Sequence, residues 1–130
     1  LVYTATDVEW HNHLGAGMQV QVPDNKFLIV RLSITNGGGK PVAVPLLFLE
    51  TDNGKRIPEL QEVQGMPEWM GLLREIDPAE TLQGRIIFDA PPRNLKLRIT
   101  DGATEEDERT AYIDIQYRLG GAPAVPSGGF

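Results

Sequence analysis

The sequence of 130 residues contains no cysteine, two serines and two histidines. Without cysteine, the chain has neither a disulfide, nor a thiolate metal site, nor a thiol nucleophile. An activated serine needs a base beside it and a third group that orients the base. Ser33 lies far in sequence from both His11 and His13, and Ser127 lies in a Gly/Pro-rich segment. We therefore expect no nucleophilic catalysis.

Long apolar runs and clusters of basic residues are also missing. The longest apolar segments, Phe27 to Val30 and Val42 to Leu49, are far shorter than the ~20 residues that cross a bilayer. Twelve Lys and Arg residues are scattered among eighteen Asp and Glu, and the net charge is -6. Because clustered basic residues supply most of the affinity for nucleic acid, we expect no nucleic-acid partner and no membrane span in this chain.

Aromatic residues are few, with two Trp, three Tyr and four Phe. A glycosidase places its paired carboxylates in a cleft lined by sugar-stacking aromatic rings. Eighteen Asp and Glu residues offer many carboxylate pairs, but several of the aromatic residues are needed for the core. We therefore predict that the protein is not an enzyme and has no cofactor.

Period-two alternation of apolar and polar residues is the main pattern, and no window of a dozen residues sustains a helical stripe. A first strand is expected within Leu1 to Trp10, although its inward face is ambiguous, and a hairpin is expected from Pro45 to Ile57 around the Asp52-Asn-Gly54 turn. The other predicted strands are Met18–Val22, Leu28–Ile34, Leu82–Phe88, Leu95–Ile99 and Ala111–Tyr117. About seven or eight short strands predict an all-β fold of two packed antiparallel sheets.

The chain divides into a sandwich domain at residues 1–119 and a tail at residues 120–130. The tail is rich in Gly and Pro, which is typical of flexible segments. Leu1 already lies in strand-like sequence, so we expect that a longer chain preceded it. A signal peptide or a lipid anchor could have been part of that segment.

Four phrases carry a resemblance to a known family: Phe27–Asn36, Leu49–Gly54, Ile76–Gly84 and Ile87–Pro91. They resemble bacterial extracytoplasmic domains of unknown function, often lipoproteins, that share an immunoglobulin-like antiparallel β-sandwich with a secreted mycobacterial immunogenic protein. The resemblance implies export and envelope contacts, and it implies no catalytic residue. This chain has Pro78-Ala where the family commonly has Pro-Gly, which leaves the type of that turn open.

The region from Glu59 to Leu73 lacks strand character, because Gly65, Pro67 and Gly71 interrupt its apolar residues. We expect a long crossing connection with room for one helical turn. Within it, Trp69 is flanked by Met66 and Met70, a combination of residues enriched at interfaces. If the connection lies on the surface, these three residues predict a binding patch, whereas the alternative is that they cap the open end of the sandwich.

Glu9, His11 and His13 would share one face if the first strand continued that far, and they could then bind Zn²⁺ or Cu²⁺. The alternative is an ordinary polar turn at residues 10–15. The acidic run Glu105–Glu108 lacks the spacing of an EF-hand loop and is expected to be a solvated hairpin loop. Gly37–Lys40 lacks the helix of a phosphate-binding loop and is expected to be a hairpin turn.

The sequence predicts a non-catalytic exported β-sandwich module that makes protein or structural contacts at the cell envelope. Its expected partners are an envelope protein or a second copy joined through an edge strand. Membrane attachment is expected only through an N-terminal anchor outside this chain. The alternative function is a small-ligand module for a glycan or a divalent metal, motivated by Trp69 and by Glu9, His11 and His13.

Overall fold

The computed structural model describes residues 1–12, 26–63, 66–100, 109–116 and 127–129. This part of the chain holds ten strands and no helix. It therefore has no apolar helix that could cross a membrane. The strands are β1 (Val2–His11), β2 (Lys26–Thr35), β3 (Val42–Ala43), β4 (Phe48–Glu50), β5 (Arg56–Pro58), β6 (Glu75–Ile76), β7 (Thr81–Ala90), β8 (Leu95–Thr100), β9 (Thr110–Ile115) and β10 (Ser127–Gly129).

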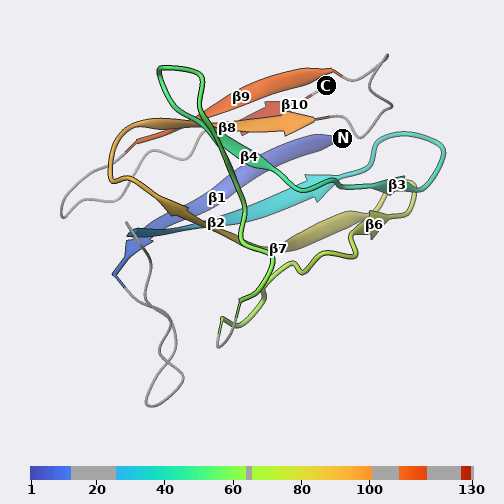
Figure 1. Ribbon diagram of the computed structural model, residues 1–130. Coiled ribbons are helices and arrows are strands. Elements are labelled where there is room, and N and C mark those ends of the chain that lie inside the picture. Colours follow the sequence, from blue (N-terminus) through green and yellow to red (C-terminus); the bar gives the residue numbers. More distant parts are fainter. Residues whose placement is uncertain (13–25, 64–65, 101–108, 117–126, 130) are drawn as a thin grey trace.

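Two four-stranded antiparallel sheets form the sandwich (Figure 1), with strand orders β10-β1-β2-β7 and β5-β4-β8-β9. The short pair β3 and β6 forms a third small sheet. The predicted all-β sandwich is confirmed. The strands outnumber the expected seven or eight because several of them, such as β3 and β6, have only two or three residues.

Inward-facing apolar residues of both sheets form one core, as the alternation predicted. In β2 these are Leu28, Val30, Leu32 and Ile34, and in β8 they are Leu95, Leu97 and Ile99. The hydroxyl of the fully buried Tyr3 donates a hydrogen bond of 2.5 Å to the Thr100 carbonyl. This bond links β1 to β8 and so joins the two sheets across the core.

A bulge in β1 explains why the inward face of this strand was ambiguous in the sequence. The register with β2 shifts between Ala5 and Asp7, so that Thr6 is an extra residue. Before the bulge, Tyr3 and Ala5 are buried, whereas after it the buried residue is Val8. The extra residue reverses the alternation, and no single period-two pattern fits the whole strand.

Asn36 ends β2 and directs the chain away from a hairpin. Its buried side-chain amide donates to the carbonyls of Lys40 and Ile76, at 2.7 and 2.9 Å, and its oxygen accepts from the Gly38 amide at 2.9 Å. The chain therefore continues into β3, which pairs with β6 and not with β2. The hairpin expected at residues 37–40 is wrong for this reason.

The turn from Asp77 to Glu80 has Ala79 at φ 64°. The Glu80 amide donates to the Asp77 carbonyl at 3.1 Å, and a positive φ at the third residue, after a proline, is typical of a type II turn. The Ala79 amide also donates to the Asn36 carbonyl at 2.8 Å. An alanine thus adopts the left-handed conformation that glycine adopts most easily, which answers the question left open by the Pro78-Ala sequence.

Part of the predicted tail is a strand. Ser127–Gly129 pair with Val2–Thr4 as β10, because backbone hydrogen bonding to an edge strand does not require large side chains. The rest of residues 120–130 and the predicted strand Met18–Val22 lie outside the described residues. The hairpin of β4 and β5 around Asn53-Gly54 is confirmed, with Gly54 at φ 82°.

Candidate functional site

The connection, residues 59–74 between β5 and β6, is closed at its base by a buried ion pair. The guanidinium of Arg74 donates to both carboxylate oxygens of Glu59, at 2.8 and 3.1 Å, and both side chains are fully buried. The Leu47 amide donates to the same carboxylate at 2.7 Å, and Arg74 Nε donates to the Val44 carbonyl at 3.2 Å. The polar atoms at this position therefore satisfy one another, and the two ends of the connection are held together.

The first part of the connection covers the outer face of the sheet that contains β2 and β7. There Phe27, Ile29 and Ile87 form a second buried apolar cluster. Leu60, Val63 and Met66 of the connection pack against it; Figure 1 shows this segment on the side of the sheet away from β8 and β9. The first half of β2, Phe27 to Val30, is consequently buried on both faces, whereas the sequence predicted one buried face.

The connection also pairs with the outer edge of β7. The Leu60 amide donates to the Ile87 carbonyl at 2.8 Å, and further along the Met70 amide donates to the Arg85 carbonyl at 2.8 Å. The Arg85 amide donates to the Glu68 carbonyl at 2.8 Å, which makes a parallel bridge with Trp69 opposite Arg85. Because an unpaired strand edge recruits other strands, this pairing blocks the central part of β7 as a site of edge-strand association.

Gly84 allows the connection to approach β7 closely. A Cβ atom at Gly84 would lie 3.0 Å from the Glu68 carbonyl oxygen and 3.3 Å from Cα and Cβ of Met70. These distances are shorter than ordinary van der Waals contacts, and the first two involve backbone atoms, which yield little. The alternation in the sequence predicts that Gly84 lies on the inner face for close packing, and its close neighbour in the structure is the connection.

Glu68 pairs with Arg31 on the exposed surface of the sheet. Arg31 lies directly opposite Arg85 across β2 and β7, so two like charges face each other there. The hydrogen bond from Arg31, its positive charge and the charge of Arg85 together hold the pKa of Glu68 below its ordinary value. The carboxylate of the connection thereby relieves the repulsion between the two arginines.

The three predicted binding residues lie in different settings. Met66 is half-buried against the outer cluster, and Met70 is half-buried against the main core. Trp69 is partly exposed, but its indole Nε1 is buried and has no hydrogen-bond partner in the described part of the chain. The two methionines therefore hold the connection in place, and Trp69 combines a partly exposed ring with a buried Nε1 that has no partner among the described residues.

Leu72 and Leu73 are the apolar residues that the connection exposes most. Leu73 is 100% exposed and Leu72 is 47% exposed, directly after Gly71 at φ 73°. Among the described residues the other exposed large apolar side chains are Val2 and Tyr112, which are not adjacent to each other in the sequence. Both leucines belong to the apolar residues expected in the connection, and the glycine before them in the sequence does not indicate that they are exposed.

The residues of the metal hypothesis are only partly described. His11 Nε2 lies 3.3 Å from a Glu9 carboxylate oxygen, so two of the three lie together on β1, while His13 lies outside the described residues. Within the described ranges no three His, Asp or Glu side chains are grouped as metal ligands. The acidic run at residues 105–108 also lies outside the described ranges.

Comparison with known proteins gives a family and a fold. A family model described as "Domain of unknown function (DUF4352)" matches residues 1–109. A crystal structure of a functionally unknown protein from Listeria monocytogenes EGD-e is similar, with a TM-score of 0.57, 7% sequence identity and coverage of 88% of this chain and 85% of that chain. No curated protein matches the chain. At 7% identity the structural similarity shows the fold alone.

Proposed function

Since the chain belongs to the DUF4352 family of domains of unknown function, we propose from its surface that it is a non-catalytic, exported β-sandwich module that binds a partner protein at the cell envelope. The proposed contact is the connection surface, defined as Trp69, Leu72 and Leu73. Export and an envelope location are supported by the four sequence phrases that resemble extracytoplasmic lipoproteins. The resemblance of these phrases to a secreted mycobacterial immunogenic protein also supports the proposed export.

The exposure of Leu72 and Leu73 is the observation that carries the proposal. Two consecutive leucines lose favourable free energy by staying in water, about 25 cal/mol for each Å² of apolar surface that a partner would cover. The base of the connection is fixed by Glu59 and Arg74, and its middle is fixed on β7 at Arg85. A partner would therefore meet a surface that needs little ordering on binding, which favours affinity.

Trp69 supports the same surface through the part of its ring that is exposed. Tryptophan is also among the residues enriched in the energetic centres of interfaces. The predicted patch of Met66, Trp69 and Met70 thus becomes a proposed surface in which Trp69 is joined by Leu72 and Leu73.

The proposal is tested by photo-crosslinking in cells with a photoreactive residue at position 73, and at position 2 as a control. Val2 is 46% exposed and belongs to β1, so it reports adventitious contact with an exposed apolar side chain. We expect a discrete adduct from position 73 only, and the identified partner should bind the purified Leu72→Asp/Leu73→Asp variant at least about tenfold more weakly. Equal adducts from both positions, or unchanged binding by the double variant, would contradict the proposal.

Self-association is an outcome that the same variants detect. If the adduct of position 73 is a dimer of this chain, sedimentation velocity should show a dimer that the double leucine variant loses. A dimer that persists in that variant would instead favour pairing through an outer strand of the described sheets, such as β9. Localisation is tested separately, by fractionating cells that express the natural precursor and determining the N-terminus of the mature protein.

A further inference from the structure

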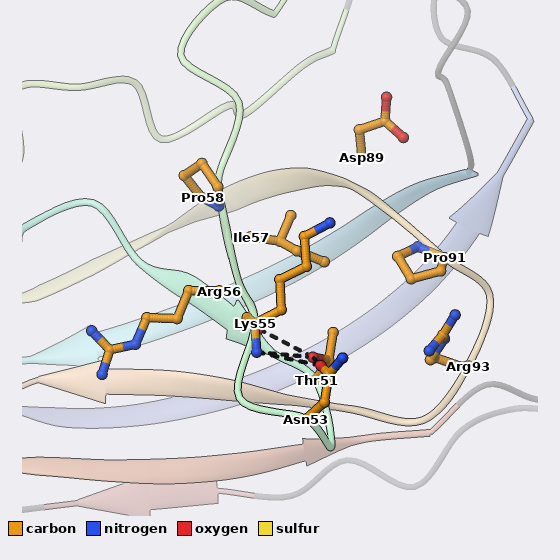
Figure 2. A pocket seen from close by; sticks show the side chains of 9 residues that line it. All are labelled: Thr51, Asn53, Lys55, Arg56, Ile57, Pro58, Asp89, Pro91 and Arg93. Atoms are coloured by element: carbon orange, nitrogen blue, oxygen red, sulfur yellow. Dashed lines mark hydrogen bonds between the residues drawn. The ribbon is translucent and has the colours of Figure 1, made fainter.

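A hollow of about 480 Å³ lies where two turns meet, away from the connection surface (Figure 2). One turn joins β4 to β5 and contributes Thr51, Asn53 and Lys55, while the other joins β7 to β8 and contributes Pro91 and Arg93. The remaining lining residues are Arg56, Ile57, Pro58 and Asp89. A volume of this size is within the range of small-molecule sites.

The turn between β4 and β5 is fixed by its own hydrogen bonds. The Thr51 amide donates to the Lys55 carbonyl at 2.9 Å, and the Lys55 amide donates to Thr51 Oγ1 at 3.1 Å. The Gly54 amide donates to the Thr51 carbonyl at 2.9 Å. In the opposite turn, the Arg93 amide donates to the Pro91 carbonyl at 2.8 Å. Both backbones are therefore ordered before any ligand arrives, which lowers the cost of binding.

The hollow concentrates positive charge in an acidic protein. Three cations and one carboxylate line it, although the chain as a whole carries a net charge of -6. Within the described residues, Lys55 and Arg93 have no ion-pair partner, in contrast to Arg74 and Arg31. Two unpaired cations on facing turns make a site that attracts an anion.

Side-chain directions identify which cations face the hollow. In Figure 2 the Lys55 side chain extends along Ile57 toward the Pro91 turn, and Arg56 points the opposite way. Arg56 Nε lies 3.9 Å from a Glu50 carboxylate oxygen, which accounts for its direction. Asp89 is directed away from Lys55 in the same view. Lys55 and Arg93, one from each turn and without an ion-pair partner among the described residues, are the lining cations left to hold an anionic group.

The other walls indicate the body of the ligand. Ile57, Pro58 and Pro91 provide apolar surface, and Thr51 and Asn53 provide polar side chains. A compact body with hydroxyl groups and a C–H face fits this mixture of polar and apolar walls.

From these features we infer that the hollow binds an acidic sugar, with its phosphate or carboxylate group between Lys55 and Arg93. Lysine holds such a group as a point charge, and the arginine guanidinium can make two parallel hydrogen bonds to it. The sugar body lies against Ile57 and the two prolines. This inference concerns a separate site and does not depend on the connection surface.

The test is an NMR titration of the whole chain with glucose 6-phosphate and with galacturonic acid, each at low and high salt. Glucose, which lacks the acidic group, and inorganic phosphate, which lacks the sugar ring, are the controls. We expect saturable shifts of the Lys55, Ile57 and Arg93 amides with at least one of the acids, weakening as salt screens the charges. Tighter binding of the phosphate or of the carboxylate ligand identifies which acid the site prefers.

Matched variants locate the binding. The variant Lys55→Gln/Arg93→Gln should bind the acidic sugar about tenfold or more weakly than the wild type does. This is the loss of affinity expected when charge-assisted hydrogen bonds are removed. Lys40→Gln is the control, because Lys40 is exposed and does not line the hollow. The inference is overturned if neither acid binds saturably, if glucose or inorganic phosphate binds as tightly as the acids, or if Lys40→Gln weakens binding as much as the double variant.

Discussion

Two Arg–Glu ion pairs hold the same connection, and they differ in how much of each pair is exposed to water. Glu59 and Arg74 are fully buried at the base, where they make two hydrogen bonds to each other and three to the backbone of Val44, Pro45 and Leu47. Arg31 and Glu68 lie at the middle of the connection, with side chains 31% and 57% exposed. A buried pair is costly to break on one side, whereas an exposed pair is screened by water and salt. The base therefore determines whether the fold closes, and the middle adjusts how the connection lies on β7.

Removing one charge of the buried pair should have the largest effect on the stability of the protein. Arg74→Met should destabilise the protein by about 3–5 kcal/mol, because the Glu59 carboxylate stays buried without its counter-ion. Chemical denaturation measures the loss, with Arg56→Met as the control at an exposed pair separated by 3.9 Å. We expect the control to change stability by less than about 0.5 kcal/mol.

The double variant Glu59→Leu/Arg74→Met sharpens this result. It removes both charges at once, so we expect it to be more stable than Arg74→Met alone. The Leu47 amide would lose its acceptor, and recovery should therefore be partial. A double variant less stable than Arg74→Met would show that the charges do not act as a pair.

The middle of the connection is tested more directly by its close packing than by its ion pair. Gly84→Ala should cost about 1–3 kcal/mol, because the new methyl group meets the Glu68 carbonyl oxygen and Met70. Gly39→Ala is the matched control, since nothing lies within 4 Å of a Cβ there. Hydrogen exchange should become faster at the Met70 amide in the first variant only. Unchanged exchange would mean that the connection does not rest on β7.

A change beside the connection separates global stability from local opening. Ala79→Gly should stabilise the protein by about 0.5 kcal/mol, since the relief of a left-handed alanine slightly exceeds the greater freedom of glycine in the unfolded chain. Denaturation midpoints measure the gain, while limited proteolysis within the connection should be unchanged. Loss of stability would indicate that this turn tolerates alanine without strain.

The exposed pair should have the smallest effect, and the effect should depend on pH. The folded-state pKa of Glu68 is below its ordinary value of 4.5, so its contribution is present above that value and is lost as pH falls through the folded-state pKa. Glu68→Gln should therefore lower stability slightly at neutral pH and low salt, and the difference from wild type should vanish in acid and in high salt. Denaturation at several pH values checks this, and a difference that grows in acid would contradict it.

Alternation of residues was sufficient to predict most of the sandwich, because β2, β7, β8 and β9 each bury every second side chain on the core side. The exceptions have local causes. An extra residue at Thr6 reverses one strand, and Phe27 and Ile29 are buried on the outer face because a segment more than thirty residues away covers them. Period-two reasoning cannot anticipate a covering segment without strand character.

The candidate sites were harder to predict than the fold. Met66, Trp69 and Met70 were identified as a group, yet their different environments depend on Gly84 and on the pairing with Arg85. Glu59 and Arg74 are charged residues fifteen positions apart, and nothing in the sequence indicates that they meet away from water. Lys55 lies in a turn within one sheet and Arg93 in the turn that links the two sheets, so their meeting at one hollow is a property of the assembled sandwich.

The closure at Glu59 and Arg74 has a consequence for how such domains diversify. The connection is closed at its base inside the protein, so residues inserted between Glu59 and Arg74 need not disturb the two sheets. Lengthening a closed loop costs only about 0.6 kcal/mol for each doubling. The connection can therefore differ in length and sequence between homologous domains while the sandwich stays the same.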